Sequence, residues 1–289
     1  MSPSHLERRF RVVAGEEDVA SAWIWSLDPL GVEWRDEPAG SVAVAYFRAD
    51  DCPPLPEGFP YALLAEEPVA STDWLAAWRA AASPIEVGRQ LLIDPRELDA
   101  VEALPETGGR HLLRLPARTA FGVGSHESTR LAWELAESLD LAGRAVLDVG
   151  CGTGILAFGC RLLGAGRVVG FDLDPAAALL AGQYARHNRV AVPFFVGRVA
   201  ALAAHPAARP PFDLLLVNVI PEEIRGELPE LLALLARDGE AVFSGILERE
   251  ADAALAELAR HGLVERDRRV AGEWAALRTA RAGAPARSA

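Results

Sequence analysis

Strand-like and helix-like segments alternate through the second half of the chain, and this alternation restricts the fold more than any other feature. Apolar runs such as AVLDVG (145–150) and FDLLLVN (212–218) have the length and composition of strands, whereas ILAFGCRLLG (155–164) has apolar residues at helical spacing. Strands that are connected through helices build a parallel sheet with helices on both faces. The last two strands, 263–269 and 273–280, follow each other without a helix, so we expect them to pair antiparallel at one edge.

The N-terminal part of the chain predicts a second, smaller domain. Segments 9–14, 31–37 and 41–48 have the composition of strands, and segment 16–27 has the apolar spacing of a helix. Together they predict a small α+β domain with an antiparallel sheet. The proline-rich stretch 50–60 is not expected to hold regular structure, because proline lacks a backbone donor and fixes φ.

These patterns divide the chain into four parts. Residues 1–70 form the small domain, and 71–118 form a linker helix with connecting strands. Residues 119–280 form the larger α/β domain, and 281–289 are expected to be a disordered tail. The hydrophobic content of 51% over 289 residues is sufficient for two modest domains with real cores.

Composition excludes several classes of protein and of chemistry. No apolar run reaches the length of a membrane span, and the first residues lack the apolar core of a signal peptide. The three cysteines make no pattern for a disulfide framework or a zinc site, so we expect no metal and a reducing cytoplasm. All 29 basic residues are arginine, which excludes a Schiff-base lysine and the lysine of a phosphate-binding P-loop.

The net charge of −12 is unevenly distributed. Most of it lies in the first hundred residues, where acidic residues outnumber arginines more than two to one. Such an acidic region repels nucleic acid and attracts a basic partner. The alternative interpretation is a solvated surface that favours solubility.

A glycine-rich turn connects the strand at 145–149 to the helix that follows. The stretch VLDVGCGTGILAFG (146–159) contains alternating glycines and matches the dinucleotide-binding pattern G-x-G-x-x-G/A. A turn of this kind brings backbone N–H groups close to a ligand, but the pattern alone is unspecific. The candidate ligand-binding residues in this turn are Asp148, Gly150, Gly152 and Gly154.

Two acidic residues narrow the choice of ligand. Asp148 ends its strand directly before the glycines, where a carboxylate would repel a pyrophosphate but tolerate a cationic ligand without phosphate. Asp172 ends the next strand, where a carboxylate can accept from both ribose hydroxyls. The alternative for Asp172 is a helix N-cap, a role that suits Asp174 better because Pro175 follows it. S-adenosylmethionine, a ribose-containing sulfonium compound, fits both acids.

Two further positions lie at places where α/β sheets bind ligands. Asn218 follows a fully apolar run, and its amide carbonyl could accept a hydrogen bond from an amine nucleophile; the alternative is a turn-forming asparagine. The loop AFGVGSHEST (120–129) precedes a helix and offers polar groups, among them His126. The alternative for this loop is a simple helix cap with a structural histidine.

These motifs, taken in order along nearly the whole chain, resemble the PrmA family, the ribosomal protein L-eleven lysine methyltransferases. The glycine turn is shared by a very large superfamily, whereas the combination of DWLxxWR, AFGxGxHxxT and SGIL is far more specific. The matching segments are DWLAAWR (73–79), AFGVGSHESTRLA (120–132), VLDVGCGTGILA (146–157), GFDLDP (170–175), FDLLLVN (212–218), SGIL (244–247) and EW (273–274).

The resemblance implies a ferredoxin-like N-terminal domain that docks the substrate protein, a linker, and a Rossmann-like seven-stranded methyltransferase domain. It implies S-adenosylmethionine as the cofactor and a basic ribosomal protein as the partner, with no direct nucleic-acid or membrane binding by a cytoplasmic monomer. Asn218 would also lie beside the incoming amine, as the catalytic residue. The residues expected to contact the cofactor are Phe121, His126, Thr129, Asp148, Gly150, Gly152, Gly154, Asp172 and Asn218.

The chain departs from the family pattern directly after Asn218. The family usually continues with Ile or Leu and then small residues, whereas this chain reads VIPEE (219–223). Because this segment borders the target amine, the departure bears on the substrate more than on the cofactor. Three alternatives stay open: a methyltransferase for another protein or a small amine, an NAD(P)-dependent oxidoreductase, and a non-catalytic adaptor that binds S-adenosylmethionine or a ribosomal protein.

Overall fold

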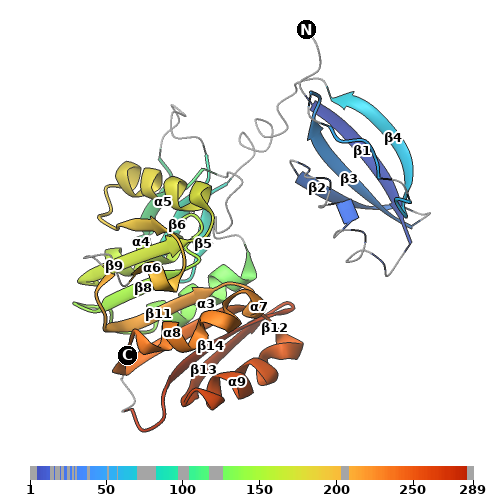
Figure 1. The fold of residues 1–289 in the computed structure, drawn as a ribbon. Helices are drawn as coiled ribbons and strands as arrows, with labels where there is room; N and C mark the ends of the chain where they lie inside the picture. The colour runs from blue at the N-terminus through green and yellow to red at the C-terminus, as the bar shows by residue number, and fades with distance from the viewer. Residues whose placement is uncertain are drawn as a thin grey trace. The chain divides into compact units, whose positions relative to one another are not determined.

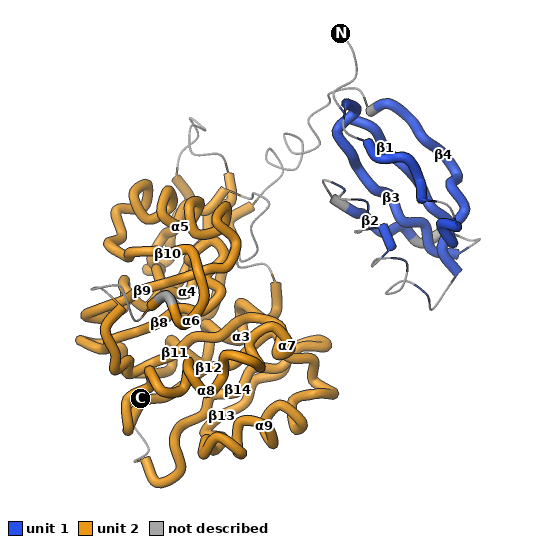
Figure 2. Tube along the Cα trace, in the orientation of Figure 1, with its two compact units in different colours: residues 1–81 blue, residues 82–289 orange. Residues whose placement is uncertain are grey.

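The chain divides into two compact units, Met1–Ala81 and Ala82–Ala289 (Figure 2). Two expectations, the linker helix at 71–82 and the placement of Phe121, lie outside the residues that the structure describes. The computed structural model describes residues 5–13, 16, 20, 23–24, 27, 29, 31–37, 40–50, 52–56, 58–69, 83–96, 104–116, 126–202 and 208–284.

Unit 1 contains a four-stranded antiparallel sheet in the order β2-β3-β1-β4 (Figure 1). This is the strand order of ferredoxin-like sheets. Most of the helix predicted over 16–27 lies outside the described residues, but Ala20 and Ile24 are described and are buried with Phe10 and Phe47. The strands are β1 (His5–Val12), β2 (Gly31–Glu37), β3 (Gly40–Arg48) and β4 (Ala62–Val69).

The edge strand β4 is the element of unit 1 that the sequence pattern does not reveal. Its sequence ALLAEEPV lacks a clean alternation of apolar and polar residues, and Pro68 argues against a central strand but is tolerated at an edge. The buried Arg8 on β1 donates to Glu66 on β4 over 2.6 Å. The edge strand therefore supplies the carboxylate that compensates a buried guanidinium.

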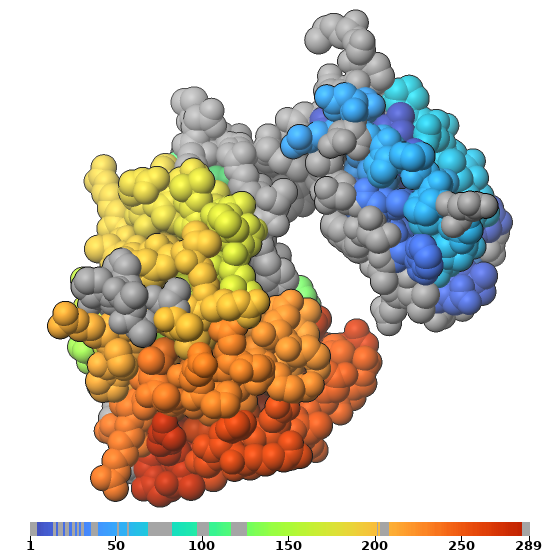
Figure 3. Space-filling view, viewed as in Figure 1, coloured from blue at the N-terminus to red at the C-terminus, as the bar shows by residue number. Residues whose placement is uncertain are grey.

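Unit 2 is built on a seven-stranded sheet in the order β10-β9-β8-β11-β12-β14-β13 (Figure 1). Neighbours from β10 to β12 are parallel, and β14 is antiparallel to both β12 and β13. The predicted α/β fold class is confirmed. In the space-filling view, unit 2 passes from yellow segments at one end to orange and red segments at the other (Figure 3). The strands are β8 (Ala145–Val149), β9 (Arg167–Asp172), β10 (Phe194–Val196), β11 (Phe212–Asn218), β12 (Leu235–Leu247), β13 (Leu263–Ala271) and β14 (Trp274–Arg281).

Helices cover both faces of this sheet, because its strands are apolar on both sides. One core contains Trp133, Phe158 and Tyr184 from three helices on one face, and a second core contains Leu231 and Leu258 from the other face. The helices are α3 (Glu127–Glu137), α4 (Ile155–Leu162), α5 (Pro175–Asn188), α6 (Val199–Leu202), α7 (Pro221–Ile224), α8 (Leu228–Ala233) and α9 (Ala251–Arg260), with short 3₁₀ turns η2 (Arg225–Glu227) and η3 (Glu248–Glu250).

The run PELLALLARDG (229–239) has the apolar spacing that predicts one continuous helix, and this prediction is wrong in its second half. Helix α8 ends at Ala233, and β12 already begins at Leu235, which pairs with Phe212. The run ELLALLAR has good helix propensity, but pairing with β11 overrides it. At Gly239 a Cβ would lie 3.1 Å from the backbone carbonyl oxygens of Ala236 and Phe212, so a side chain would be crowded where the chain rejoins the sheet.

The connecting strands after the first unit form a small sheet that packs on α3. Strands β5 (Ile85–Val87), β6 (Leu91–Asp94) and β7 (His111–Arg114) contribute buried residues to the same core as Trp133. The side chain of Asn188 on α5 bonds to both the backbone N–H and the carbonyl of Arg114. No described helix of the chain is long and apolar enough to cross a membrane.

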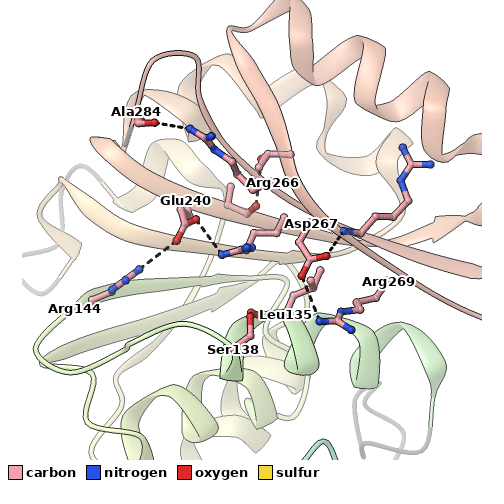
Figure 4. A network of polar contacts seen from close by, with 12 residues as sticks. Leu135, Ser138, Arg144, Glu240, Arg266, Asp267, Arg269 and Ala284 are labelled. Carbon is pink, nitrogen blue, oxygen red and sulfur yellow. Dashed lines mark hydrogen bonds and ion pairs between the residues drawn. The ribbon is translucent and has the colours of Figure 1, made fainter. Parts of the chain in front are cut away.

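A buried ion-pair network lies at the amino ends of the central strands (Figure 4). The carboxylate of Glu240 on β12 lies 3.5 Å from Arg144 before β8 and 3.4 Å from Arg278 on β14. Glu240 is only 4% exposed. The network holds three segments together at the amino ends of the parallel strands, whereas Asn218 lies at their carboxyl ends.

Candidate active site

A cavity of about 420 Å³ lies at the carboxyl ends of β8, β9 and β11. The structure brings together most of the residues predicted from the sequence, and Gly154 is the exception among those described. Gly154 packs instead in the helix turn, where a Cβ would lie 2.8 Å from the ring of Phe194. The predicted residues that line the cavity are His126, Thr129, Asp148, Gly150, Gly152, Asp172 and Asn218.

The glycine turn runs close to the segment that follows β11. Gly150 has a φ of 65°, in the left-handed region, and a Cβ there would lie 2.3 Å from Cγ1 of Val219. Both observations require glycine. The N–H of Gly152 donates to Asp172 over 2.9 Å, which ties the turn to the end of β9.

Asp148 is a buried carboxyl group at the end of β8. One of its oxygens accepts from the N–H of Ala157 on α4 at 3.2 Å, and the side chain lines the cavity. Burial raises the pKa of Asp148 to about 8, with the nearby charge of Asp172 acting in the same direction. Near neutral pH the carboxyl group of Asp148 is therefore protonated in most molecules. It then repels a pyrophosphate less than the charged carboxylate expected from the sequence would.

The same hydrogen bond supplies a different argument about phosphate. Dinucleotide sites hold pyrophosphate on the free N–H groups at a helix N-terminus. Here the N–H of Ala157 is already used by Asp148. This part of the helix terminus is therefore closed to an anion, whereas a cation beside Asp148 would favour the charged carboxylate.

Asp172 is held in one orientation at the end of β9. One oxygen accepts from the N–H of Gly152, and the other accepts from the N–H of Asp174 at 3.0 Å. Asp174 is the N-cap of α5 and accepts from Ala176, with Pro175 in the first turn, as the sequence predicts. Asp172 is thus not the N-cap of α5. Its fixed carboxylate lines the cavity and has remaining lone pairs that can accept from ribose hydroxyls.

Asn218 and Thr129 meet at the wall of the cavity. The side-chain Nδ2 of Asn218 donates to Oγ1 of Thr129 over 3.2 Å. The Oδ1 atom of the same amide is buried and has no partner among the described residues. Buried amide oxygens are normally satisfied, so an orphaned one on a residue that lines the cavity indicates a missing donor.

His126 is the N-cap of α3, and this bears out the structural alternative for it. Its Nδ1 accepts from the N–H of Ser128 and lies 2.8 Å from the Ser128 hydroxyl. Its ring also contacts the indole of Trp274. His126 lines the cavity as well, so capping and wall formation are combined in one residue.

Two residues that line the cavity, and one residue beside it, have no role assigned from the sequence, although the motifs that contain them are recognised there. The hydroxyl of Ser244 donates to the carbonyl of Ser128 over 2.8 Å. Gly245 has a φ of 78°, and a Cβ there would lie 2.9 Å from the carbonyl of Val219. Gly245 and Trp274 both line the cavity. The segments SGIL and EW thus build one wall of the site.

The segment after Asn218 begins a helix. Pro221 occupies the first turn of α7, followed by two glutamates, an arrangement that suits a helix N-terminus. Val219, Ile220 and Glu223 line the cavity. The departure from the family pattern therefore lies at the site itself.

The charge of the cavity suits a cation and not a phosphate. Four acidic side chains line it, and no arginine of the described chain does. The described residues also contain no group of three His, Cys, Asp or Glu side chains that could hold a metal ion. A ribose-containing sulfonium compound fits the fixed carboxylate of Asp172, the bare backbone at Gly150 and the orphaned oxygen of Asn218.

Comparison with known proteins identifies relatives of this chain. The family "Ribosomal protein L11 methyltransferase (PrmA)" matches residues 60–282. The protein of that name from Synechococcus elongatus is 35% identical over 223 residues, which cover 76% of this chain and 73% of the relative. The one from Pelobacter propionicus is 39% identical over 215 residues, which cover 72% and 67% of the two chains.

A solved structure agrees with the sequence comparison. The ribosomal protein L11 methylase from Lactobacillus delbrueckii subsp. bulgaricus superposes with a TM-score of 0.61 at 28% identity, covering 69% of this chain and 99% of the other. The family match over residues 60–282 includes all seven strands of the sheet of unit 2 and the residues that line the cavity. The chain belongs to the PrmA family of S-adenosylmethionine-dependent ribosomal protein L11 methyltransferases.

Proposed function

We propose that this protein transfers methyl groups from S-adenosylmethionine to lysine and N-terminal amines of ribosomal protein L11. The observation that carries the proposal is the amide of Asn218, whose Oδ1 is buried at the cavity wall without a partner in the described chain. An acceptor in that position suits an incoming amine, which brings N–H donors. The relatives that carry the L11 name give the substrate class.

The cofactor, when bound, supplies an electrophilic methyl group on a cationic sulfur. Asp172 would hold the ribose hydroxyls, and the backbone at Gly150 and Gly152 would lie against the nucleoside. Asp148 would lie near the positive charge of the cofactor, which would favour the charged form of its carboxyl group. The other residues of the wall shape the cavity and exclude water, which is most of what a displacement with a good leaving group needs.

The amine must be neutral to act as a nucleophile. Exclusion of water, together with the positive charge of the bound cofactor, would lower the pKa of the ammonium group of an incoming lysine, so its proton leaves to the solvent. Oδ1 of Asn218 then accepts one N–H of the neutral amine and aims the lone pair. We assign no general base to the described residues, and Asn218 is the catalytic residue of this proposal.

The setting of the reaction follows from the substrate. Ribosomal proteins are basic, and the acidic first hundred residues favour docking of a basic protein. We propose that unit 1 supplies this docking surface and that the enzyme acts as a monomer in the cytoplasm, on free L11 without direct contact to RNA. Size-exclusion chromatography with light scattering tests the monomer.

A labelling experiment tests the proposal against its alternatives. Purified protein is incubated with tritiated S-adenosylmethionine and L11 from the same organism, and the product is mapped by mass spectrometry. We expect label on L11 amines, at a much lower but measurable rate in Asn218→Ala. Binding of S-adenosylhomocysteine without label on any ribosomal protein would support an adaptor instead. Binding of NADH without binding of S-adenosylhomocysteine would support an oxidoreductase.

A further inference from the structure

The amide of Asn218 has two nearly isosteric ends, and only one of them suits an amine. The end that faces the cavity must be the oxygen if it is to accept a hydrogen bond. In the structure Nδ2 is turned toward Thr129 and Oδ1 has no described partner. The orientation of the amide is therefore decided by whatever holds Nδ2.

Thr129 is built into the fold as a rigid acceptor. Its side chain is completely buried in the first turn of α3, and its backbone N–H donates to the carbonyl of His126. The preceding carbonyl, that of Ser128, accepts from Ser244 on β12. Ser244 is the register partner of Asn218 in the neighbouring strand. The first turn of α3 is thus fixed to the same strand ends that carry the asparagine.

We infer that Thr129 is a positioning residue, whose hydroxyl oxygen holds Nδ2 of Asn218 so that Oδ1 faces the incoming amine. The inference rests on the proposed function and deepens it. Without the threonine oxygen, Nδ2 would be buried without an acceptor, which is unfavourable. Rotation of the amide relieves this cost but turns a donor toward the amine.

A pair of substitutions at Thr129 separates this role from contact with the cofactor. Thr129→Val keeps the shape of the side chain and removes the oxygen, whereas Thr129→Ser keeps the oxygen. We expect kcat of the valine variant to fall on the order of 10- to 100-fold, as for a misplaced reacting group. We expect any loss of affinity for S-adenosylhomocysteine to be much smaller than the loss of kcat, and Thr129→Ser to recover most of kcat.

A double-mutant cycle shows whether Thr129 acts through Asn218. If it does, Thr129→Val has no further effect on kcat in the Asn218→Ala background, because the group that it positions is absent. Additive effects would overturn the inference. So would full activity of Thr129→Val, or a loss of S-adenosylhomocysteine affinity as large as the loss of kcat.

A measurement without turnover keeps the inference separate from the proposed function. The chain contains two asparagines, Asn188 and Asn218, so selective ¹⁵N-asparagine labelling gives two side-chain amide signals. We expect one proton of the Asn218 signal to be protected from exchange in wild type and unprotected in Thr129→Val. Asn188, bonded to Arg114, is the internal control. Equal exchange in both proteins would overturn the inference, whereas wild type that protects this proton but labels no amine would count against the proposed function alone.

Discussion

The imidazole of His126 meets the indole of Trp274 edge-on, with ring centroids 4.8 Å apart and an angle of 67° between the planes. The contact joins the N-cap of α3 to the first residue of β14, two positions that are far apart in the sequence. Both side chains line the cavity. One wall of the cavity therefore depends on a contact between two segments of unit 2 that are remote in the sequence.

Loss of this contact should loosen the wall. We expect Trp274→Ala to weaken S-adenosylhomocysteine binding by up to about tenfold, because an aromatic pair contributes roughly 0.5–1.5 kcal/mol beyond its buried area. Trp274→Phe keeps a ring and should bind nearly as wild type. Titration calorimetry on both variants measures the difference. Equal affinity of the alanine variant and wild type would mean that the wall does not need the ring pair.

The elevated pKa of Asp148 predicts a pH dependence of cofactor binding. Since its pKa is about 8 in the free protein, and a cationic ligand favours the carboxylate, binding should release a proton below that pH. Affinity for S-adenosylmethionine should then rise with pH between about 6 and 7.5, by at most about tenfold per pH unit. Asp148→Asn should remove the dependence. Calorimetry in buffers of different ionisation enthalpy measures the released proton directly, and no proton release in wild type would contradict the prediction.

Removal of the fixed carboxylate at the end of β9 should affect the nucleoside. We expect Asp172→Ala to weaken S-adenosylhomocysteine binding by about 100-fold, because two charge-assisted hydrogen bonds to ribose are lost. Asp174→Asn is the matched control, since asparagine is also a good N-cap and Asp174 caps α5. A loss of affinity in the control as large as in Asp172→Ala would indicate that the whole turn, and not one carboxylate, binds the ligand.

Two glycines allow the effect of backbone strain to be separated from that of a clash. Gly143 and Gly150 have φ values of 72° and 65°, but a Cβ would meet nothing within 4 Å at the first and Val219 at the second. Gly143→Ala should cost about 1–2 kcal/mol of stability from strain alone and leave binding intact. Gly150→Ala should destabilise further and abolish measurable binding. Urea unfolding and calorimetry on both variants provide the comparison, and equal behaviour of the two would be the contrary result.

The buried network at Glu240 should contribute to stability and not to chemistry. Glu240→Ala leaves Arg144 and Arg278 without their shared carboxylate, and breaking a buried pair in this way costs about 3–5 kcal/mol. Glu222→Ala removes an exposed pair with Arg225 and should cost less than about 1 kcal/mol. Thermal unfolding compares the two variants. A decrease in Tm that is as small for Glu240→Ala as for Glu222→Ala would show that the buried network contributes little to stability.

Most of the larger fold is predictable because its strands are short, apolar on both faces and separated by helices with clear signals. Asp174 and Pro175 mark the start of α5, and the structure places both as expected. The strand ends then bring Asp148, Asp172 and Asn218 to one edge, since parallel strands share their carboxyl ends. Local pattern and topology agree there.

The remaining errors arise where long-range contacts decide the local structure. The helix-like run that ends α8 is broken because Leu235 pairs with Phe212 on β11. Strand β4 lacks a clear strand pattern in its sequence, but its Glu66 accepts from the buried Arg8 on β1. The contributions of Ser244 and Trp274 to the site also depend on partners that are remote in sequence. The segments that contain them can be recognised in the sequence, but not what they touch.

The cavity is lined by carboxylates and by Asn218, which can accept hydrogen bonds from an amine substrate. The chain itself contains arginine but no lysine. No copy of the enzyme can therefore present a lysine to another copy, and self-labelling is restricted to the amino terminus. In a methylation assay, radioactivity on a side-chain amine always reports the added protein. The enzyme cannot act as a competitor for its own substrate at such positions, however concentrated it becomes.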